Sequence, residues 1–298
     1  MARSRKMVVA VIGNYMSNNL GDDLYLHQLG SKFPEHQFIA HSKLEKTKPD
    51  YILFGGGGVL RDEDPRVQLL MEWTRQFNVP YGVFSVGCAD NTENYTNRNR
   101  FFGDADFVTV RDPISADAIP GSVLLPDLAW TYMPEATANV KSDTGIMLRH
   151  SLAFNSFDLV VRTRELMSTM QGDFRFFSTY GERIGDRTLA HATRAGFPST
   201  FSLYTGNKLT EYLDHHYRRV SQILVMPLHG IILAAIYNVP WAGWAYSYKT
   251  RRIAEELSAH ISTDLQGTLH FNITSRSCVS RLRELAEKHF TILARYLP

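Results

Sequence analysis

The chain has 298 residues, which is enough for two domains of ordinary size, each with its own core. Hydrophobic residues make up 44% of the chain and charged residues 21%, so it has the composition of a folded globular protein without a long disordered arm. Lys and Arg total 32 against 30 Asp and Glu, and the formal charge of +2 excludes nucleic-acid binding driven by overall charge. Any anion site must therefore be local.

The cysteines and the apolar segments show which kinds of protein the sequence does not resemble. The two cysteines, Cys88 and Cys278, lie far apart without C-x-x-C spacing, so the sequence predicts neither a disulfide framework nor a metal site. The apolar run at 7–12 is too short for a signal-peptide core and is interpreted as the first strand. No apolar segment reaches the ~20 residues that a membrane span needs. A reducing cytoplasm is the expected location.

The first half alternates short apolar runs with longer polar-patterned segments. Such alternation predicts a mostly parallel sheet with helices on both faces, whose loops at the carboxyl ends of the strands carry function. The predicted strands are residues 7–12, 51–54, 81–86, 107–110 and 123–125, with a helical pattern at 64–78.

A linker-like segment at 133–144, rich in small and polar residues, precedes a second alternation of the same kind. Its predicted strands are 145–149, 174–178, 202–204, 222–226 and 241–244, with helices near 158–170, 207–220 and 250–260 and an amphipathic helix at 278–296. We therefore predict an α/β fold of two Rossmann-like domains facing a cleft. Their predicted boundaries are 1–138 and 139–298, and the final helix is a candidate to pack back toward the N-terminal domain.

The segment from Gly13 to Leu24, GNYMSNNLGDDL, follows the first predicted strand and opens a helix. Asn19 or Asp22 can cap that helix, and backbone amides of the turn can face a bound ligand. The functional interpretation is acceptor binding, with Asp22 or Asp23 as a base. The alternative is an ordinary turn, rich in Asn because Asn tolerates left-handed backbone.

Two further features lie at predicted strand ends in this half. Four glycines, 55–58, cost backbone entropy, so close approach of the backbone to a ligand or to the opposing domain is favoured over a flexible turn. Arg111 follows the strand at 107–110, and an ion pair with Asp112 or Asp127 is its favoured interpretation. Asp127 either caps a helix or orients a residue across the cleft.

In the second half, three cationic or titratable residues lie near predicted strand ends. His229 stands where a buried strand hands over to an apolar helix, which is a usual ligand position in α/β sheets. Arg149 can bind a carboxylate or phosphate at two points, and Lys249 adds an amine. Together they indicate an anionic substrate. The alternatives are a core histidine, a salt bridge at the strand end and a surface lysine.

Taken in order, these segments resemble the polysaccharide pyruvyl transferase family. No single motif is diagnostic, but six occur in one order between Gly13 and Lys249. The resemblance is carried by Gly13-Asn14-Tyr15 with Asn18 to Leu24, Gly55 to Gly58, Ser85-Val86-Gly87, Val110-Arg111-Asp112 with Ser115, Asp127 with Ala129, and Leu228-His229-Gly230 followed by Tyr248-Lys249.

The resemblance implies a GT-B-like fold and transfer of a pyruvyl (carboxyvinyl) unit from phosphoenolpyruvate to sugar hydroxyls, giving a ketal in polysaccharide or exopolysaccharide biosynthesis. We expect His229 to donate a proton to the methylene carbon or to stabilise the departing phosphate, and Asp22 or Asp23 to act as the base. Phosphoenolpyruvate is the donor substrate, and no cofactor is expected. The implied donor-binding residues are Arg149, His229, Gly230 and Lys249, and the acceptor-binding residues are Asn14, Tyr15, Asn19, Gly56, Gly57 and Arg111.

The chain departs from the family at Pro227, where an Arg-x-His-Gly motif usually has its arginine. Three explanations stay open: Arg183 or Arg251 replaces the cation, the donor is a different molecule, or catalysis is lost. A GT-B glycosyltransferase using a nucleotide sugar and a non-catalytic glycan-binding relative are the alternatives. The expected partner is a glycan or lipid-linked saccharide, which could bring the protein to the inner face of the membrane. The oligomeric state is left open.

Overall fold

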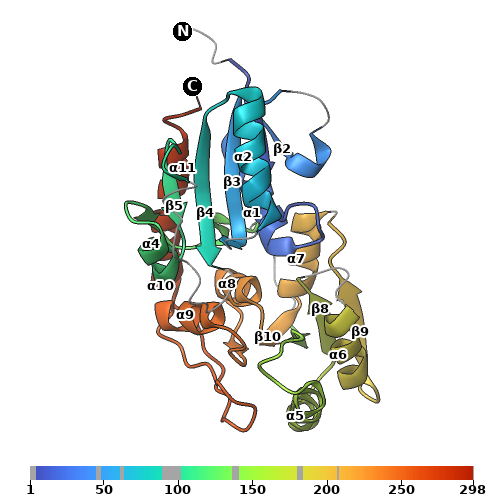
Figure 1. The fold of residues 1–298 in the computed structure, drawn as a ribbon. Coiled ribbons are helices and arrows are strands. Elements are labelled where there is room, and N and C mark those ends of the chain that lie inside the picture. Colours follow the sequence, from blue (N-terminus) through green and yellow to red (C-terminus); the bar gives the residue numbers. More distant parts are fainter. Residues whose placement is uncertain are drawn as a thin grey trace. The chain divides into compact units, whose positions relative to one another are not determined.

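The computed structural model describes residues 5–44, 48–60, 64–88, 102–135, 141–179, 184–206 and 208–297. The chain divides into two compact units, and Figure 1 shows their elements coloured along the sequence. The first unit comprises Met1–Ser17, Gly21–Thr131 and Arg281–Pro298, and the second comprises Asn18–Leu20 and Tyr132–Ser280. Each contains a parallel sheet with helices, so the predicted α/β fold with two Rossmann-like domains is confirmed.

The described strands of the first unit form one parallel sheet in the order β2-β1-β3-β4-β5-β6. The chain leaves β1 toward one edge and then builds the other side from β3 onward, so the switch point lies between β1 and β3. The short strand β2 was not predicted. The bounds are β1 (Val8–Ile12), β2 (Gln37–Ala40), β3 (Tyr51–Leu60), β4 (Tyr81–Cys88), β5 (Val108–Val110) and β6 (Val123–Leu124).

Helices of the first unit pack on this sheet because its central strands are apolar at consecutive positions and so offer apolar side chains on both faces. Ile12 and Phe54 of one face share a core with Leu70 of α2 (Pro65–Phe77). The α2 helix begins where the side chain of Asp64 accepts the amide of Arg66. Before the chain enters the second unit, the other described helices and 3-10 turns are α1 (Leu20–Lys32), η1 (His41–Lys43), α4 (Pro113–Ala118) and η2 (Leu128–Thr131).

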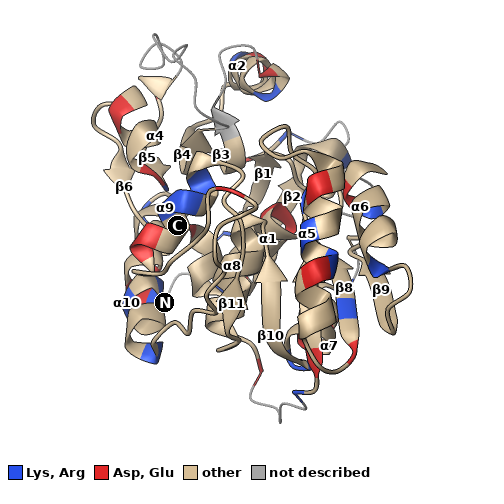
Figure 2. Cartoon of the chain, turned by 90° about the horizontal axis from the view of Figure 1, so that it is seen from below, with Lys and Arg blue, Asp and Glu red and all other residues tan. Residues whose placement is uncertain are grey.

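The second unit also has a parallel sheet, in the order β11-β10-β7-β8-β9, with its switch point between β7 and β10. Helix α5 carries charged residues of both signs (Figure 2), in keeping with the low net charge. The strands are β7 (Asp143–Met147), β8 (Phe174–Ser178), β9 (Ser199–Leu203), β10 (Val220–Val225) and β11 (Trp241–Ala242), and the helices α5 (Ser156–Thr169), α6 (Ile184–Arg194), α7 (Leu209–Tyr217), α8 (Leu228–Ile236) and α9 (Tyr248–Glu256).

The predicted C-terminal helix and the predicted linker differ from the structure. The expected helix at 278–296 is two helices, α10 (Arg276–Ala286) and α11 (Lys288–Leu293), because the carbonyl of Glu287 accepts the amides of both Phe290 and Thr291 and starts a new turn there. The linker predicted at 133–144 ends earlier, because Asp143 and Thr144 already belong to strand β7 and pair with β10. Among the described residues, no helix is both long enough and apolar enough to cross a bilayer.

Candidate functional site

The two groups of predicted site residues follow the strands that flank the two switch points. In the first unit, Asn14 and Tyr15 follow β1, and the glycines belong to β3. In the second unit, Arg149 follows β7, and His229 follows β10. Because ligands of open parallel sheets bind outside the carboxyl ends of the strands at a switch point, each unit presents its motif residues at the position where binding is expected.

The glycine run is part of strand β3, whereas the sequence predicted that the strand ends before it. Gly56 and Gly57 have φ values of +76° and +84°, which L side chains rarely adopt. A Cβ atom on Gly56 would lie 2.3 Å from the hydroxyl oxygen of Tyr15, and one on Gly57 would lie 2.6 Å from Oδ1 of Asp22. The predicted close approach of the backbone is thus an approach to side chains of the same unit.

A buried hydrogen-bond network joins α1, β5 and the segment before η2. The hydroxyl of Tyr25 donates to Oδ1 of Asp127 at 2.6 Å, and Nη1 of Arg111 donates to that hydroxyl oxygen at 3.0 Å. Arg111 also pairs with Oδ2 of Asp127 at 2.7 Å, and both side chains are 6% exposed. Of the two partners considered for Arg111, the structure selects Asp127. The predicted acceptor-binding guanidinium is therefore engaged inside the unit.

Asp22 and Asp23, the two candidate bases, have different environments. Asp22 is buried, and this burial raises the pKa of its carboxyl from 3.8 to about 7, although Arg111 and a hydrogen bond from Asn14 lower it. Asp23 is partly exposed, and its Oδ1 accepts the amide of Met16 at 2.7 Å, which closes the loop after β1. A carboxyl with a pKa near neutrality can exchange a proton at physiological pH, so Asp22 fits the role of a base better than Asp23 does.

Two other predicted acceptor residues flank this loop. Tyr15 is buried, and its hydroxyl donates to the carbonyl oxygen of Gly55 at 2.7 Å. Burial and the neighbouring Asp22 raise the pKa of the Tyr15 phenol well above 10, so the hydroxyl stays protonated. Asn19 directly precedes helix α1 and is grouped with the second unit. The structure thus gathers Asn14, Tyr15 and Asp22 near the β3 glycines.

In the second unit, Arg149 is held by an acidic residue of helix α6. Its Nη1 donates to Oδ2 of Asp186 at 3.0 Å, and the amide of His150 donates to Oδ1 of the same carboxylate at 2.6 Å. Asp186 lies in the first turn of α6 and is buried, as is Arg149. The carboxylate therefore fixes both the guanidinium and the backbone that carries it.

His229 occupies the first turn of α8, directly outside the end of β10. The helix begins after Pro227, which has no side chain that can cap it, so the first amides of α8 lack an intrahelical partner. A Cβ atom on Gly230 would lie 2.5 Å from Cγ2 of Val225 and 2.7 Å from Sδ of Met147. Glycine there lets the first turn pack closely on β10 and β7, with His229 half-buried beside it.

Lys249 lies in the first turn of α9, which follows β11. A capping box formed by Ser247 and Thr250 fixes that turn. The strands β11, β10 and β7 are adjacent, so Lys249, His229 and Arg149 follow three neighbouring strands at one edge of the sheet. Of the cations considered as replacements for the family arginine, Arg251 is exposed on α9, and Arg183 lies outside the described residues.

Sequence reasoning missed two residues that the structure places in these networks. Tyr25 lies three residues after Asp22 on α1, a helical spacing that puts both on one face. Asp186 carried no signal, because its partner Arg149 is 37 residues away. Among the described residues, no group of three or more His, Cys, Asp or Glu side chains could hold a metal ion.

The family model of polysaccharide pyruvyl transferases matches residues 19–248. The chain belongs to this family. The match begins at Asn19, covers the first-unit network of Tyr25, Arg111 and Asp127, and ends at Tyr248, one residue before Lys249. No curated protein is found to match the chain at a significant level.

Solved structures of the same fold include sugar-nucleotide epimerases. The chain is similar to UDP-N-acetylglucosamine 2-epimerase from Rickettsia bellii, with a TM-score of 0.56, 12% identity and coverage of 98% of this chain and 97% of that one. The MnaA–UDP complex from S. aureus has the same TM-score and identity, with coverage of 97% and 91%. A putative UDP-N-acetylglucosamine 2-epimerase from Listeria monocytogenes reaches a TM-score of 0.53 at 11% identity, with coverage of 97% and 91%. At these identities the likeness supports the GT-B-like fold alone.

Proposed function

We propose that this pyruvyl transferase family member moves a pyruvyl unit from phosphoenolpyruvate to a sugar of a polysaccharide or lipid-linked glycan. The main support is the position of Arg149, His229 and Lys249 after three adjacent strands of one sheet. Phosphoenolpyruvate carries a phosphate and a carboxylate, so it needs more than one anion-binding group. A guanidinium fork and an ammonium supply two of them.

The start of helix α8 supplies a third anion-binding group and bears on the missing family arginine. Backbone amides at a helix N-terminus bind anions, and the first turn of α8 has no side-chain cap at Pro227. In this proposal the helix start holds part of the charge that an arginine at position 227 would otherwise hold. The hydrogen bond from Arg149 to Asp186 supports this proposal, because it holds the guanidinium in one position.

In the proposed reaction, His229 protonates the methylene carbon of phosphoenolpyruvate, which gives a methyl group and an oxocarbenium-like carbon. One sugar hydroxyl attacks this carbon and a second closes the ring as phosphate leaves, so one hydroxyl proton replaces the proton from His229 and the other departs with phosphate. Asp22 is the proposed acceptor of a hydroxyl proton, because its pKa of about 7 allows it to take up and release a proton near neutral pH. General acid-base help of this kind contributes roughly 10²–10⁴-fold in rate.

The test is incubation of the protein with phosphoenolpyruvate and candidate acceptor glycans, followed by mass spectrometry for one added pyruvyl ketal and by assay of released phosphate. Thermal-shift titration with phosphoenolpyruvate and with UDP- and GDP-sugars identifies the donor independently of the acceptor. The His229→Ala variant should bind and fold but lose turnover, whereas His191→Ala, an exposed histidine on α6, should keep it. A thermal shift with nucleotide sugars and none with phosphoenolpyruvate would reject the proposal.

A further inference from the structure

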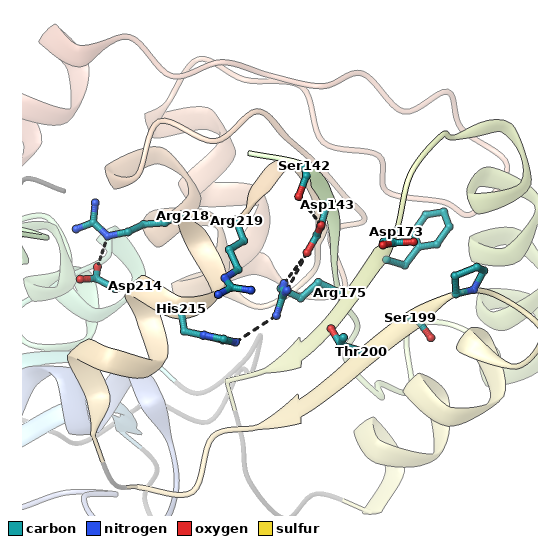
Figure 3. A pocket seen from close by; sticks show the side chains of 12 residues that line it. Ser142, Asp143, Asp173, Arg175, Ser199, Thr200, Asp214, His215, Arg218 and Arg219 are labelled. Carbon is teal, nitrogen blue, oxygen red and sulfur yellow. Dashed lines mark hydrogen bonds and ion pairs between the residues drawn. The ribbon is translucent and has the colours of Figure 1, made fainter. Parts of the chain in front are cut away.

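A cavity of about 730 Å³ opens in the second unit at the amino ends of β7, β8 and β9, beside the end of α7. Cavities of this size accommodate small-molecule ligands. The donor residues proposed above follow the carboxyl ends of strands in the same sheet. A five-residue strand spans roughly 16 Å, so the cavity is separate from that edge. Figure 3 shows the side chains that line it.

The buried guanidinium of Arg175 has hydrogen-bonding capacity that the protein does not use. Its Nε and Nη2 reach Oδ2 of Asp143 at 2.9 and 2.8 Å, and its Nη1 lies 3.3 Å from Nε2 of His215 (Figure 3). A guanidinium carries five N–H donors, so two of them have no acceptor among the described residues. The other oxygen of Asp143, Oδ1, already accepts the hydroxyl of Ser142 at 2.7 Å.

A second guanidinium adds positive potential at the same wall. Arg219 is exposed and lines the cavity, and within the described part of the chain its side chain makes no hydrogen bond or ion pair. The pKa of His215 is lowered first by burial and then by Arg219 and Arg175, so both cations lie close to that ring. His215 accepts from Arg175, which has no acceptor atoms, and therefore stays neutral.

Beside the apolar side chains of Phe174 and Pro198, the lining also has polar side chains that suit hydroxyl groups. Ser199 and Thr200 at the start of β9 and Asp173 before β8 line the cavity with side-chain oxygens. A carboxylate there would repel a bare anion but accepts hydrogen bonds from alcohols. The cavity therefore combines a cationic wall with groups that bind hydroxyls.

We propose that this cavity binds a small phosphorylated sugar, with its phosphoryl group on Arg175 and Arg219 and its hydroxyls toward Asp173, Ser199 and Thr200. The bidentate geometry of arginine matches phosphoryl oxygens, and the two unused N–H groups of Arg175 gain acceptors when the ligand binds. This proposal does not depend on the proposed transferase function. In this proposal the amino ends of β7, β8 and β9 bind a different ligand from the one bound at their carboxyl ends.

Isothermal titration with glucose 1-phosphate tests the proposal, with inorganic phosphate and glucose as the separate fragments. The whole ligand should bind more tightly than either fragment, and Arg219→Gln should weaken binding at least ~10-fold because one of two phosphoryl-binding guanidinium groups is lost. The matched control is Arg276→Gln, an exposed arginine on α10 of the same unit, which should bind like wild type. All titrations are done at one ionic strength, so that the screening of charges is the same in each. A non-specific effect of losing one positive charge would then weaken binding in Arg219→Gln and Arg276→Gln alike.

A second pair of measurements separates this site from the donor edge. Arg149→Gln should leave glucose 1-phosphate binding unchanged, and phosphoenolpyruvate should not compete with it. Arg175→Lys, checked for folding by circular dichroism, should weaken binding because it keeps the charge but removes the fork. The proposal is overturned if Arg219→Gln binds like wild type, if Arg276→Gln loses as much affinity, or if Arg149→Gln abolishes binding.

Discussion

Oδ1 of Asp22 occupies the space that a Cβ atom on Gly57 would need, at a distance of 2.6 Å. Gly57 also has a φ of +84°. Replacement by alanine therefore strains the backbone and displaces a buried carboxyl, and we expect Gly57→Ala to lower the free energy of unfolding by about 2–4 kcal/mol. Urea unfolding followed by circular dichroism measures this change.

The control for this prediction is Gly30 in helix α1. A Cβ atom there would meet nothing within 4 Å, and the residue has an ordinary helical backbone. Gly30→Ala should therefore raise the free energy of unfolding, by roughly 0.5–1 kcal/mol. If Gly57→Ala is as stable as wild type, the close approach of Gly57 to Asp22 is not the reason for a glycine at this position.

The raised pKa of Asp22 predicts a pH-dependent effect of Asp22→Asn. Its folded pKa of about 7 exceeds the value of 3.8 for the free side chain, so its contribution to stability is present below pH 3.8 and is lost as pH rises toward 7. Asparagine does not ionise, so the variant does not lose stability in this way as pH rises. We expect the variant to be more stable than wild type at pH 8, by up to ~4 kcal/mol, and to differ little near pH 4.

Thermal unfolding of both proteins across this pH range provides the measurement, and Asp23→Asn is the control. Asp23 is partly exposed and bonded to the amide of Met16, so its replacement should not give a comparable pH-dependent gain. If Asp22→Asn and wild type show parallel stability profiles, the carboxyl of Asp22 has an ordinary pKa. In the proposed reaction, the stabilised variant should also lose activity, because the amide cannot accept a proton.

The sequence was sufficient to predict the residues at both switch points. Strands of alternating or continuous apolar character set the order of elements, and parallel topology brings residues after adjacent strands, such as Arg149 and His229, to one edge. The extent of β3 was not predictable in the same way. Its glycines look like a turn unless the positions of Tyr15 and Asp22 are known.

The amino-edge cavity illustrates the other limit. Its cationic wall joins Arg175 from β8 with His215 and Arg219 from α7 and the residues after it, and each of these looks like an ordinary surface residue in the sequence. Only the register of β8 beside β7 shows that Arg175 is buried against Asp143. Pairings between residues so distant in the chain have no local pattern from which they could be predicted.

His289 of α11 links three segments of the first unit and should make stability sensitive to acid. Its Nε2 donates to the carbonyl of Pro126 at 3.0 Å, so its Nδ1 accepts from the hydroxyl of Thr109 at 2.9 Å. Burial lowers the pKa of His289 from 6.5 to about 4. Between these values the unfolded chain binds a proton that the folded chain excludes, so stability falls by up to ~3 kcal/mol as pH drops from 6.5 to 4.

The variant His289→Phe removes this titration but leaves buried partners unsatisfied. We expect it to be less stable than wild type at pH 8, by about 2–4 kcal/mol, and to lose less stability on acidification. Unfolding of both proteins at pH 8 and pH 5 measures the two effects. The exposed His191→Gln control should keep the wild-type profile, and an unchanged acid sensitivity in His289→Phe would contradict the prediction.

Asp186 should act on the proposed reaction through Arg149. Its carboxylate accepts hydrogen bonds from Nη1 of Arg149 at 3.0 Å and from the amide of His150 at 2.6 Å. Asp186→Ala therefore frees both the Arg149 side chain and the backbone next to it. We expect KM for phosphoenolpyruvate to rise about 10-fold or more with a smaller change in kcat, because donor positioning is lost while His229 is intact. Asp158→Ala, which removes an exposed acid from the first turn of α5, should leave both constants unchanged. A loss of kcat without a rise in KM would instead place Asp186 in the chemical step.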